Sequence, residues 1–268
     1  MYKNRLDLHT HSDNSPDGCH NTMLLCEYAD RVGLRALAIT DHCECNAYYS
    51  DRYHISSRQA FFEVNKAKAV FMGKLVVLAG VELGQPLQNR EAAKTVLRSR
   101  YDFVLTSVHN LTDMQDFYYL DYTLPENDPD ALLDRYFAEA LDTVRWGNFD
   151  SLAHLTYPLR YMPGGPDKDL SAFREQTDEI LRALAQNGRA LEINTSGLRT
   201  ENPYFSPSAA LVRRFRELGG EYLTIGSDAH SAHDVGAGIE EGMELALSCG
   251  FRYVTLYQNR TPIQIPIE

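Results

Sequence analysis

The residues in this chain that could do chemistry are histidines and acids placed at or just after the ends of short apolar runs. His9 and His11 are two positions apart, so in an extended strand both imidazoles project to the same side and can share one ion. Imidazole and carboxylate ligands suit zinc, iron or manganese. The sequence therefore predicts a metal site, built from His9, His11, His42, Glu82, His109, His154, Asp228 and His230.

A single histidine is more often an ordinary buried or surface residue than a metal ligand. Six of the nine histidines, however, stand at predicted strand ends on one face, and this number favours a metal site. Cys43 and Cys45 offer a thiolate alternative, but no second cysteine pair lies at zinc-finger spacing, so we expect ordinary loop and core cysteines. The other histidines are expected at the surface or beside ligands: His20, His54 and His233.

The elements that must position these groups alternate between short β-rich runs and longer segments of helical period, which is typical of βα units around a parallel sheet. The predicted helices include residues 58–72 behind Ser56 and Ser57 as caps, 130–146 behind Asp128, and 170–186. The predicted strands are residues 5–9, 35–40, 75–81, 102–108, 150–154, 190–194 and 222–226, with an eighth run at 253–257.

Seven such units predict an α/β barrel in which the carboxyl ends of the strands meet on one face. On that face, ligands scattered over most of the sequence would come together. Residues 110–128 and 156–169 are long polar or Pro- and Gly-rich loops, and loops of this length in a compact barrel are usually functional. No linker-like stretch divides the sequence, so residues 1–268 are predicted to form a single barrel domain.

Composition narrows the class of protein. With 44% hydrophobic and 24% charged residues, the 268-residue chain falls in the soluble globular range. The formal charge of −11 argues against nucleic acid as a partner, and no apolar run approaches the roughly 20 residues that span a bilayer, so we expect no membrane insertion. Five cysteines, an odd number, with no signal peptide before the first strand, predict a reducing, cytoplasmic location.

Several short motifs resemble, in order along the chain, those of the polymerase and histidinol phosphatase (PHP) superfamily. Within it, the segment Leu191–Arg199 and the loop around Arg160 resemble the monofunctional histidinol-phosphate phosphatases. The resemblance implies a distorted seven-stranded (β/α)7 TIM-like barrel, the PHP fold, with the run at 253–257 outside the ring. The motifs are Asp7-Leu-His9-Thr-His11, Thr40-Asp41-His42, Gly80-Val81-Glu82, Ser107-Val108-His109, Ala153-His154 and Gly226-Ser227-Asp228-Ala229-His230.

The resemblance also implies three divalent ions, of zinc, iron or manganese. The first would be held by His9, His11, Glu82 and Asp228; the second by Glu82, which bridges, with His109 and His154; the third by Asp17, His42 and His230. Asp17 has an alternative as a plain turn residue in Ser-Pro-Asp-Gly. Asp7 and Asp41, which precede ligands, are expected to orient imidazoles. Three ions against three carboxylates leave a net charge of about +3, which attracts an anion.

Two arginines fit that anion. Arg160 lies six residues past His154 and Arg199 five past Asn194, so both are expected in loops on the same face, where a guanidinium can clamp phosphate oxygens. Each has the alternative of a surface ion pair. We therefore predict a metal-dependent phosphomonoesterase that hydrolyses L-histidinol phosphate, a step of histidine biosynthesis, with a metal-held hydroxide as nucleophile and no side chain yet assigned as proton donor.

The alternatives are a PHP phosphoesterase for another small phosphate monoester, an amidohydrolase, and a metal-binding domain that has lost catalysis. The amidohydrolase predicts a lysine at the end of the fourth strand, where this chain has His109. All nine ligand positions are filled, which argues against a lost activity. Glu44 and residues 113–122 are candidates for selecting the imidazole end of the substrate. The oligomeric state is left open.

Overall fold

The computed structural model describes residues 2–268. Parallel strands follow one another around a ring in sequence order. The ring closes between its last and first strands, where Leu8 N donates to Ile225 O at 3.0 Å and Thr10 forms a parallel bridge with Ala229. This confirms the predicted distorted seven-stranded barrel. Its strands are β1 (Leu6–Asp7), β2 (Ala36–Ile39), β4 (Val76–Gly84), β5 (Phe103–Ser107), β6 (Ser151–Leu152), β7 (Ala190–Asn194) and β8 (Leu223–Gly226).

A short additional strand, β3 (His42–Glu44), continues the line of β2 after a break at Thr40 and Asp41. It keeps the same register on β4, because Ile39 pairs with Ala79 and His42 pairs with Glu82. The break was not predicted from the sequence. Its consequence is that His42 and Glu82 lie side by side at the carboxyl edge of the sheet.

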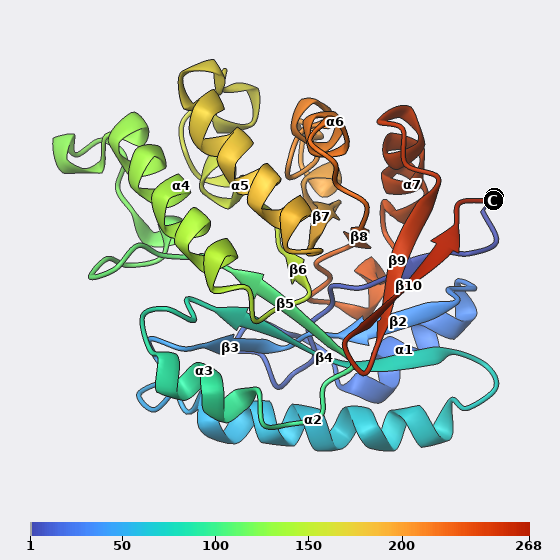
Figure 1. Cartoon of the computed structure of the whole chain (residues 1–268). Helices are drawn as coiled ribbons and strands as arrows, with labels where there is room; N and C mark the ends of the chain where they lie inside the picture. The colour runs from blue at the N-terminus through green and yellow to red at the C-terminus, as the bar shows by residue number, and fades with distance from the viewer. Residues whose placement is uncertain (1) are drawn as a thin grey trace.

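Helices cover the outside of the ring, with α4 to α7 in a row on one side of the sheet and α2 and α3 on the other (Figure 1). Their bounds are α1 (Thr22–Arg31), α2 (Tyr53–Val70), α3 (Arg90–Val96), α4 (Pro129–Trp146), α5 (Arg174–Gln186), α6 (Ala209–Glu217) and α7 (Ile239–Ser248). Short 3-10 helices lie at Phe117–Tyr119, Pro125–Asn127, Tyr157–Arg160, Gly165–Asp167, Ser171–Phe173, Ser196–Arg199 and Ala232–Asp234.

The helix boundaries confirm one predicted cap and correct another. Asp128 caps α4 by accepting from Ala131 N, and Gly147 ends that helix in the left-handed region, as such residues do. The predicted start of α2 was wrong: the helix begins at Tyr53 behind Arg52, and Ser57 Oγ donates to Tyr53 O inside it instead of capping it. A serine inside a helix can satisfy its hydroxyl in this way.

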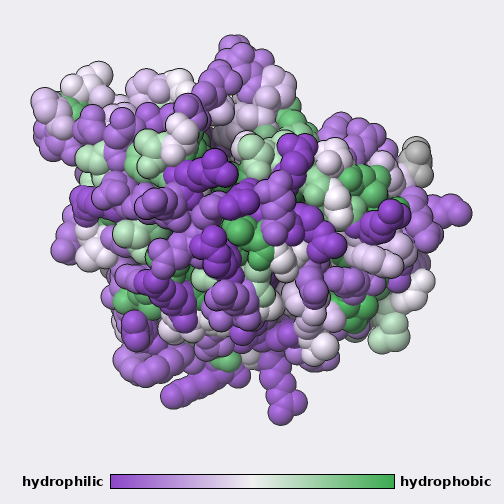
Figure 2. All heavy atoms as spheres, turned by 45° about the horizontal axis from the view of Figure 1, so that its top comes forward, coloured by the Kyte–Doolittle hydropathy of each residue, from purple (hydrophilic) through white to green (hydrophobic). Residues whose placement is uncertain are grey.

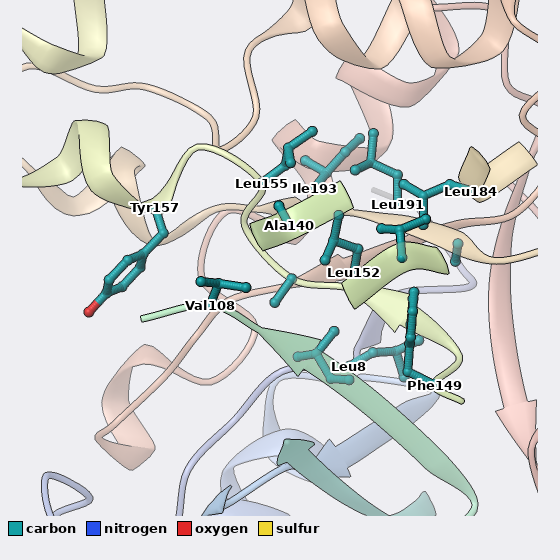
Figure 3. Close-up of a cluster of buried hydrophobic side chains, with 14 of the residues drawn as sticks. Leu8, Val108, Ala140, Phe149, Leu152, Leu155, Tyr157, Leu184, Leu191 and Ile193 are labelled. Carbon is teal, nitrogen blue, oxygen red and sulfur yellow. The ribbon is translucent and has the colours of Figure 1, made fainter. Parts of the chain in front are cut away.

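The core is built from strand residues that are buried on both faces, as expected for a parallel sheet covered by helices. All residues of β5 and β7 are buried. Leu152, Leu191 and Ile193 gather with Leu8 inside one cluster, while the Tyr157 hydroxyl points away from them (Figure 3). The core therefore ends where the polar edge of the sheet begins.

The eighth predicted run lies outside the ring, as the resemblance implied. β9 (Tyr253–Gln258) pairs antiparallel with β10 (Thr261–Pro266) in a separate two-stranded sheet. The turn between them anchors on the barrel, since Arg260 N donates to Asp102 O at 2.8 Å and Arg260 Nε lies 3.1 Å from Asp150 Oδ1. The hairpin thus ties the amino ends of β5 and β6 together.

Hydrophilic side chains cover most of the face shown in Figure 2, and hydrophobic ones form only small separate patches there. Among residues 2–268, no helix is both long enough and apolar enough to cross a membrane.

Candidate metal centre

The structure brings the candidate ligands together at the carboxyl edge of the barrel. They stand at the ends of six of its strands, and most are buried. Asp17, with a side chain 55% exposed, is the most accessible of the set. His9 and His11 follow β1, His42 opens β3, Glu82 lies in β4, His109 follows β5, His154 follows β6, and Asp228 and His230 follow β8.

Glu82 lies at the middle of this group. One carboxylate oxygen, Oε1, is 3.0 Å from His109 Nε2 and 3.1 Å from His154 Nε2. The other, Oε2, is 2.9 Å from His42 Nδ1 and 3.3 Å from His9 Nε2. Oε2 also lies 3.6 Å from His11 Nε2. The two oxygens therefore face different imidazoles, as a bridging carboxylate would.

Asp228 completes a second group with the first histidine pair. Its Oδ1 lies 3.7 Å from His9 Nε2 and 3.5 Å from His11 Nε2. Asp228 has φ +54°, in the left-handed region that a non-glycine residue enters at a cost. Its backbone N donates to His9 O at 2.8 Å, and this bond holds the strained residue against the first strand.

Asp17 reaches the outer side of the cluster. Its Oδ2 lies 3.0 Å from His230 Nε2 and 3.7 Å from His42 Nε2. The imidazole of His11 packs against both of those rings, with its centroid 4.2 Å from that of His230 and 4.3 Å from that of His42. Because Asp17 turns its carboxylate toward two imidazoles, it is more than a turn residue.

The donor atoms fit divalent ions. Nitrogen and oxygen atoms of several residues lie within 4.8 Å of one another in four groups that could each hold an ion. Many of these atoms are buried and have no hydrogen-bond partner among the described residues, although buried polar atoms almost always have one. The unpartnered donors include His9 Nε2, His11 Nε2, His42 Nδ1, Glu82 Oε2 and His230 Nε2. A shared cation satisfies such converging lone pairs.

The electrostatics keep the carboxylates ionised. Burial alone would raise the pKa of Glu82, but the charges of His42 and His109 outweigh it and hold that pKa well below its usual value. Against burial, the charges of His9 and Arg160 lower the pKa of Asp228 in the same way. Burial, with the charges of His230 and His42, holds the pKa of His11 well below its usual value. Against burial, nearby carboxylates raise the pKa of His9, His42 and His109, and a metal ion must displace those protons to bind.

Two glutamates support the centre in ways that the sequence did not predict: Glu192 was not predicted at all, and Glu44 was predicted to contact the substrate. Glu192 Oε1 lies 2.7 Å from His9 Nδ1, and its Oε2 accepts from His154 N at 2.8 Å. Its signal was an acid in the middle of a buried apolar strand. Glu44 Oε1 lies 3.1 Å from His109 Nδ1. Each fixes the ring nitrogen opposite the one that faces Glu82, which is how carboxylates orient ligating imidazoles.

Asp7 and Asp41, which were expected to orient imidazoles, act through other groups. Asp7 accepts from Ser227 N at 2.9 Å and Gly236 N at 2.8 Å, so it holds the loop that carries Asp228. Asp41 accepts from the backbone N of Ser12 at 2.6 Å and from its hydroxyl. Asp41 Oδ1 also accepts from Ser15 Oγ at 2.9 Å, and Ser15 Oγ lies 3.3 Å from His11 Nδ1, so Asp41 supports that imidazole through Ser15. Both carboxylates also bind backbone donors of ligand-bearing loops, a long-range pairing that neighbouring residues in the sequence do not reveal.

The two arginines differ in place. Arg160 Nη2 lies 3.1 Å from Asp228 Oδ2 and also donates to Ser196 Oγ. Arg199 donates to two backbone carbonyls, Ser227 O at 2.8 Å and Asp228 O at 3.2 Å. Arg160 lines the cavity above the ligands, whereas Arg199 is not among the described residues that line it and bonds the loop that carries Asp228.

The remaining metal-capable residues lie elsewhere. Cys43 and Cys45 are buried in the hydrophobic core. The His233 ring packs edge-on against Tyr28 and lies 6.0 Å from the ring of His20. The His54 imidazole lies against Tyr48. None of these residues belongs to a metal-capable group among residues 2–268.

A cavity of about 820 Å³ opens directly over the cluster. Its walls include ligand side chains such as His42 and Asp228, together with Arg160. The loop predicted to read the substrate supplies Met114, Gln115, Asp116, Tyr118 and Tyr119. An anion at the metal centre would therefore carry its organic part into a wall rich in acids and tyrosines.

A family model described as the PHP domain matches residues 7–196, well over half of the chain. The chain belongs to the PHP domain family. Histidinol-phosphatase from Lactococcus lactis is 30% identical to this PHP protein over 260 residues, covering 94% of each chain. A probable histidinol-phosphatase from Thermotoga maritima is 30% identical over 251 residues, covering 94% of this chain and 95% of its own.

Solved structures agree with the fold of this PHP protein. Histidinol phosphate phosphatase from Lactococcus lactis, complexed with zinc, L-histidinol and phosphate, superposes with a TM-score of 0.79 at 27% identity, covering 97% of this chain and 98% of that one. A putative histidinol phosphatase from Listeria monocytogenes gives a TM-score of 0.73 at 17% identity. The second likeness concerns the fold alone.

Proposed function

We propose that this PHP protein is a divalent-metal-dependent phosphomonoesterase that hydrolyses L-histidinol phosphate to histidinol and inorganic phosphate. The observation that carries the proposal is the ligand cluster at the base of a cavity whose wall holds Arg160. Support comes from relatives named histidinol-phosphatase along nearly the whole chain and from a similar structure that holds zinc, L-histidinol and phosphate.

We propose three ions in this centre. The first takes His9, His11, Glu82 and Asp228; the second takes Glu82, His109 and His154; the third takes Asp17, His42 and His230. The bridging role of Glu82 is supported by its two oxygens, since Oε2 faces His9 and His11 while Oε1 faces His109 and His154. The 3.0 Å approach of Asp17 to His230 supports the third set. Zinc, iron and manganese all suit these ligands.

Divalent ions bound there supply Lewis acidity toward the phosphoryl oxygens and activate a water molecule for attack. The residues of the chain set the charge around them. Glu44 and Glu192, beside the ligand imidazoles, add two negative charges to those of Asp17, Glu82 and Asp228, so three ions leave a net charge of about +1. A phosphate dianion therefore needs further positive charge.

Arg160 supplies that charge. Its guanidinium lies beside Asp228 at the base of the cavity and can donate two parallel hydrogen bonds to phosphate oxygens. As negative charge moves from the phosphoryl group to the departing alkoxide, a fixed cation at this place stabilises the transition state. Arg199 remains a predicted phosphate contact, and its bonds to Ser227 O and Asp228 O give it a second role in holding that loop.

The lining fits the organic half of histidinol phosphate. Apart from Arg160, the described lining residues include no other arginine or lysine, while five carboxylates face the cavity: Asp17, Glu44, Asp51, Asp116 and Asp228. Five tyrosines accompany them: Tyr53, Tyr118, Tyr119, Tyr157 and Tyr161. Carboxylates favour an ammonium group, and tyrosine rings favour a flat, partly apolar imidazole.

The test is a phosphate-release screen of purified, metal-loaded protein against histidinol phosphate and a panel of nucleotide, sugar and amino-alcohol monophosphates. The proposal predicts the highest kcat/KM for histidinol phosphate. A higher kcat/KM for another monoester would assign that ester as the substrate.

We also propose that residues 1–268 act as one barrel domain. One hydrophobic cluster supports this, since it runs from Leu6 in β1 to Ile265 in the terminal hairpin. The cytoplasmic location stays a prediction.

A further inference from the structure

Gln85 is a buried residue of the cavity wall with an unusual backbone. It directly follows β4, is 4% exposed, and has φ +44°, in the left-handed region. A glutamine in that region is uncommon, and residues held there against steric cost cluster at ligand sites. Its backbone N donates to Ser107 O at 3.0 Å, so the backbone is fixed by the next strand.

Neighbouring groups fix the orientation of the Gln85 side chain. Asn110 Nδ2 donates to Leu111 O at 2.9 Å and to Met114 O at 3.1 Å. Two carbonyl acceptors on that side mean that the amide nitrogen of Asn110 points toward them, and its Oδ1 points the other way. Asn110 Oδ1 then accepts from Gln85 Nε2 and from Asn46 Nδ2. The amide nitrogen of Gln85 is therefore committed to Asn110.

This orientation leaves Gln85 Oε1 as a buried acceptor with no hydrogen-bond partner among the described residues. Gln85, Asn110 and Asn46 all line the cavity over the metal centre. A buried carbonyl oxygen without a partner is costly, so such an atom on a residue that lines a cavity is suited to a ligand that carries a donor.

Gln85 stands immediately beyond the ligands. It lies three residues after Glu82, and its partner Asn110 directly follows His109. With the phosphate held at the metal centre and Arg160, the group next along the substrate would lie against this wall.

Resting on the proposed function, we propose that Gln85 Oε1 accepts a hydrogen bond from an N–H group of the substrate's organic half and thereby selects nitrogen-bearing monoesters. Histidinol phosphate offers two such donors, its ammonium group and its imidazole. Gln85 is a binding residue in this scheme and contributes nothing to the hydrolysis of esters that lack the donor.

The test compares Gln85→Met with the wild-type protein, both metal-loaded, on histidinol phosphate and on p-nitrophenyl phosphate, which has no N–H donor. The methionine keeps the length of the side chain and removes the acceptor. The kcat/KM for histidinol phosphate should fall about 10- to 100-fold, mostly through KM, while p-nitrophenyl phosphate should change less than about twofold. L-Histidinol should also weaken as an inhibitor of p-nitrophenyl phosphate hydrolysis, and inorganic phosphate should not.

Two further variants control for misfolding and for a general effect of replacing glutamine by methionine. Gln85→Asn tolerates the left-handed backbone and withdraws the oxygen by one carbon, so it should lose selectivity in the same direction even if Gln85→Met folds poorly. Gln176→Met makes the same substitution at a half-buried glutamine that donates to Asp134 outside the cavity, and it should behave as wild type. Metal content should be unchanged in all three.

Phosphoethanolamine, which carries an ammonium group but no imidazole, identifies the donor. A penalty on this ester assigns the ammonium group, and a penalty confined to histidinol phosphate assigns the imidazole. An equal fall on p-nitrophenyl phosphate, or no fall on any ester, would overturn the inference alone. Wild-type protein that hydrolyses p-nitrophenyl phosphate but not histidinol phosphate would contradict the proposed function together with the inference.

Discussion

At the scale of single residues, Glu82 is the ligand whose negative charge matters most. One oxygen faces His9 and His11 and the other faces His109 and His154, so in the proposed centre its negative charge serves two ions at once. Glu82→Gln keeps the volume and removes the charge. Because both adjoining ions lose a ligand charge, we expect the purified variant to contain fewer ions than the wild type by more than one ion per chain. Elemental analysis by mass spectrometry measures this directly.

Glu91→Gln is the matched control, because Glu91 is an exposed residue of α3 that pairs only with Lys94 among the described residues. It should retain the wild-type metal content. An unchanged metal content in Glu82→Gln would show that the bridge is misassigned.

The second prediction at this scale separates the two arginines. Arg160→Met removes a cation that lines the cavity, so kcat/KM should fall by about 30- to 1000-fold, with a similar loss for histidinol phosphate and p-nitrophenyl phosphate, because both carry the phosphate. Metal content should stay at the wild-type level. Steady-state kinetics on both esters, alongside elemental analysis, provide the measurement.

Arg199→Met should behave differently. Its side chain bonds the backbone of Ser227 and Asp228, so we expect a loss of activity accompanied by weaker retention of metal during dialysis. Arg145→Met, an exposed arginine of α4 that pairs with Glu179, serves as the control for both. If Arg160→Met lost activity only on histidinol phosphate, the guanidinium would read the organic half instead of the phosphate.

At the scale of elements, the terminal hairpin gives a prediction about stability without activity. Asp150 is 1% exposed at the start of β6, and Arg260 from the hairpin turn lies 3.1 Å from both of its carboxylate oxygens. Arg260→Met removes the positive charge and the hydrogen bonds that the guanidinium gives this buried carboxylate. We expect the free energy of unfolding to fall by about 1.5–3 kcal/mol in urea titrations. The kcat on metal-loaded protein should hold, because the hairpin lies at the opposite end of the strands from the ligands.

A fall in kcat as large as that of Arg160→Met would contradict this separation. Lys94→Met, which breaks only an exposed pair with Glu91 on α3, should change stability by less than about 0.5 kcal/mol and supplies the comparison.

The elements also show how far the sequence could predict the structure. Apolar runs such as residues 103–107 and 190–194 marked strands well, because a strand buried on both faces needs apolar residues at almost every position. Strand ends then placed the ligands, since parallel strands deliver their carboxyl ends to one edge. The start of α2 and the break before His42 were missed, because both depend on contacts with other elements.

The candidate site likewise contains residues that the sequence could predict and residues that it could not. The ligand imidazoles were predictable from type and position, but Glu192 and the backbone contacts of Asp7 were not. The partner of a buried carboxylate depends on which distant loop the fold brings to it. The unpartnered oxygen of Gln85 is of the same kind, because it follows from a chain of hydrogen bonds through Asn110.

At the scale of the whole molecule, the metal centre joins segments from nearly the full length of the chain. His9 and Asp228 come from the first and last strands of the ring, and His109 comes from its middle. Ions bound by these side chains link strands that are otherwise joined by edge hydrogen bonds and packing. Ligands that bind only the folded state stabilise it in proportion to the logarithm of their concentration over Kd.

Metal removal should therefore affect folding and activity together. Exhaustive chelation should abolish phosphate release, and for an ion present at about 1000 times its Kd its loss should lower Tm by about 8 to 16 °C. Manganese or zinc should restore both, as measured by phosphate release and by scanning calorimetry on the same samples.

Glu82→Gln is the internal control: because it already holds fewer ions, chelation should lower its Tm by less than it lowers that of the wild type. Chelated protein that is fully active with no transition metal by elemental analysis would contradict the metal dependence, and loss of activity with an unchanged Tm would show that the ions bind without linking the strands.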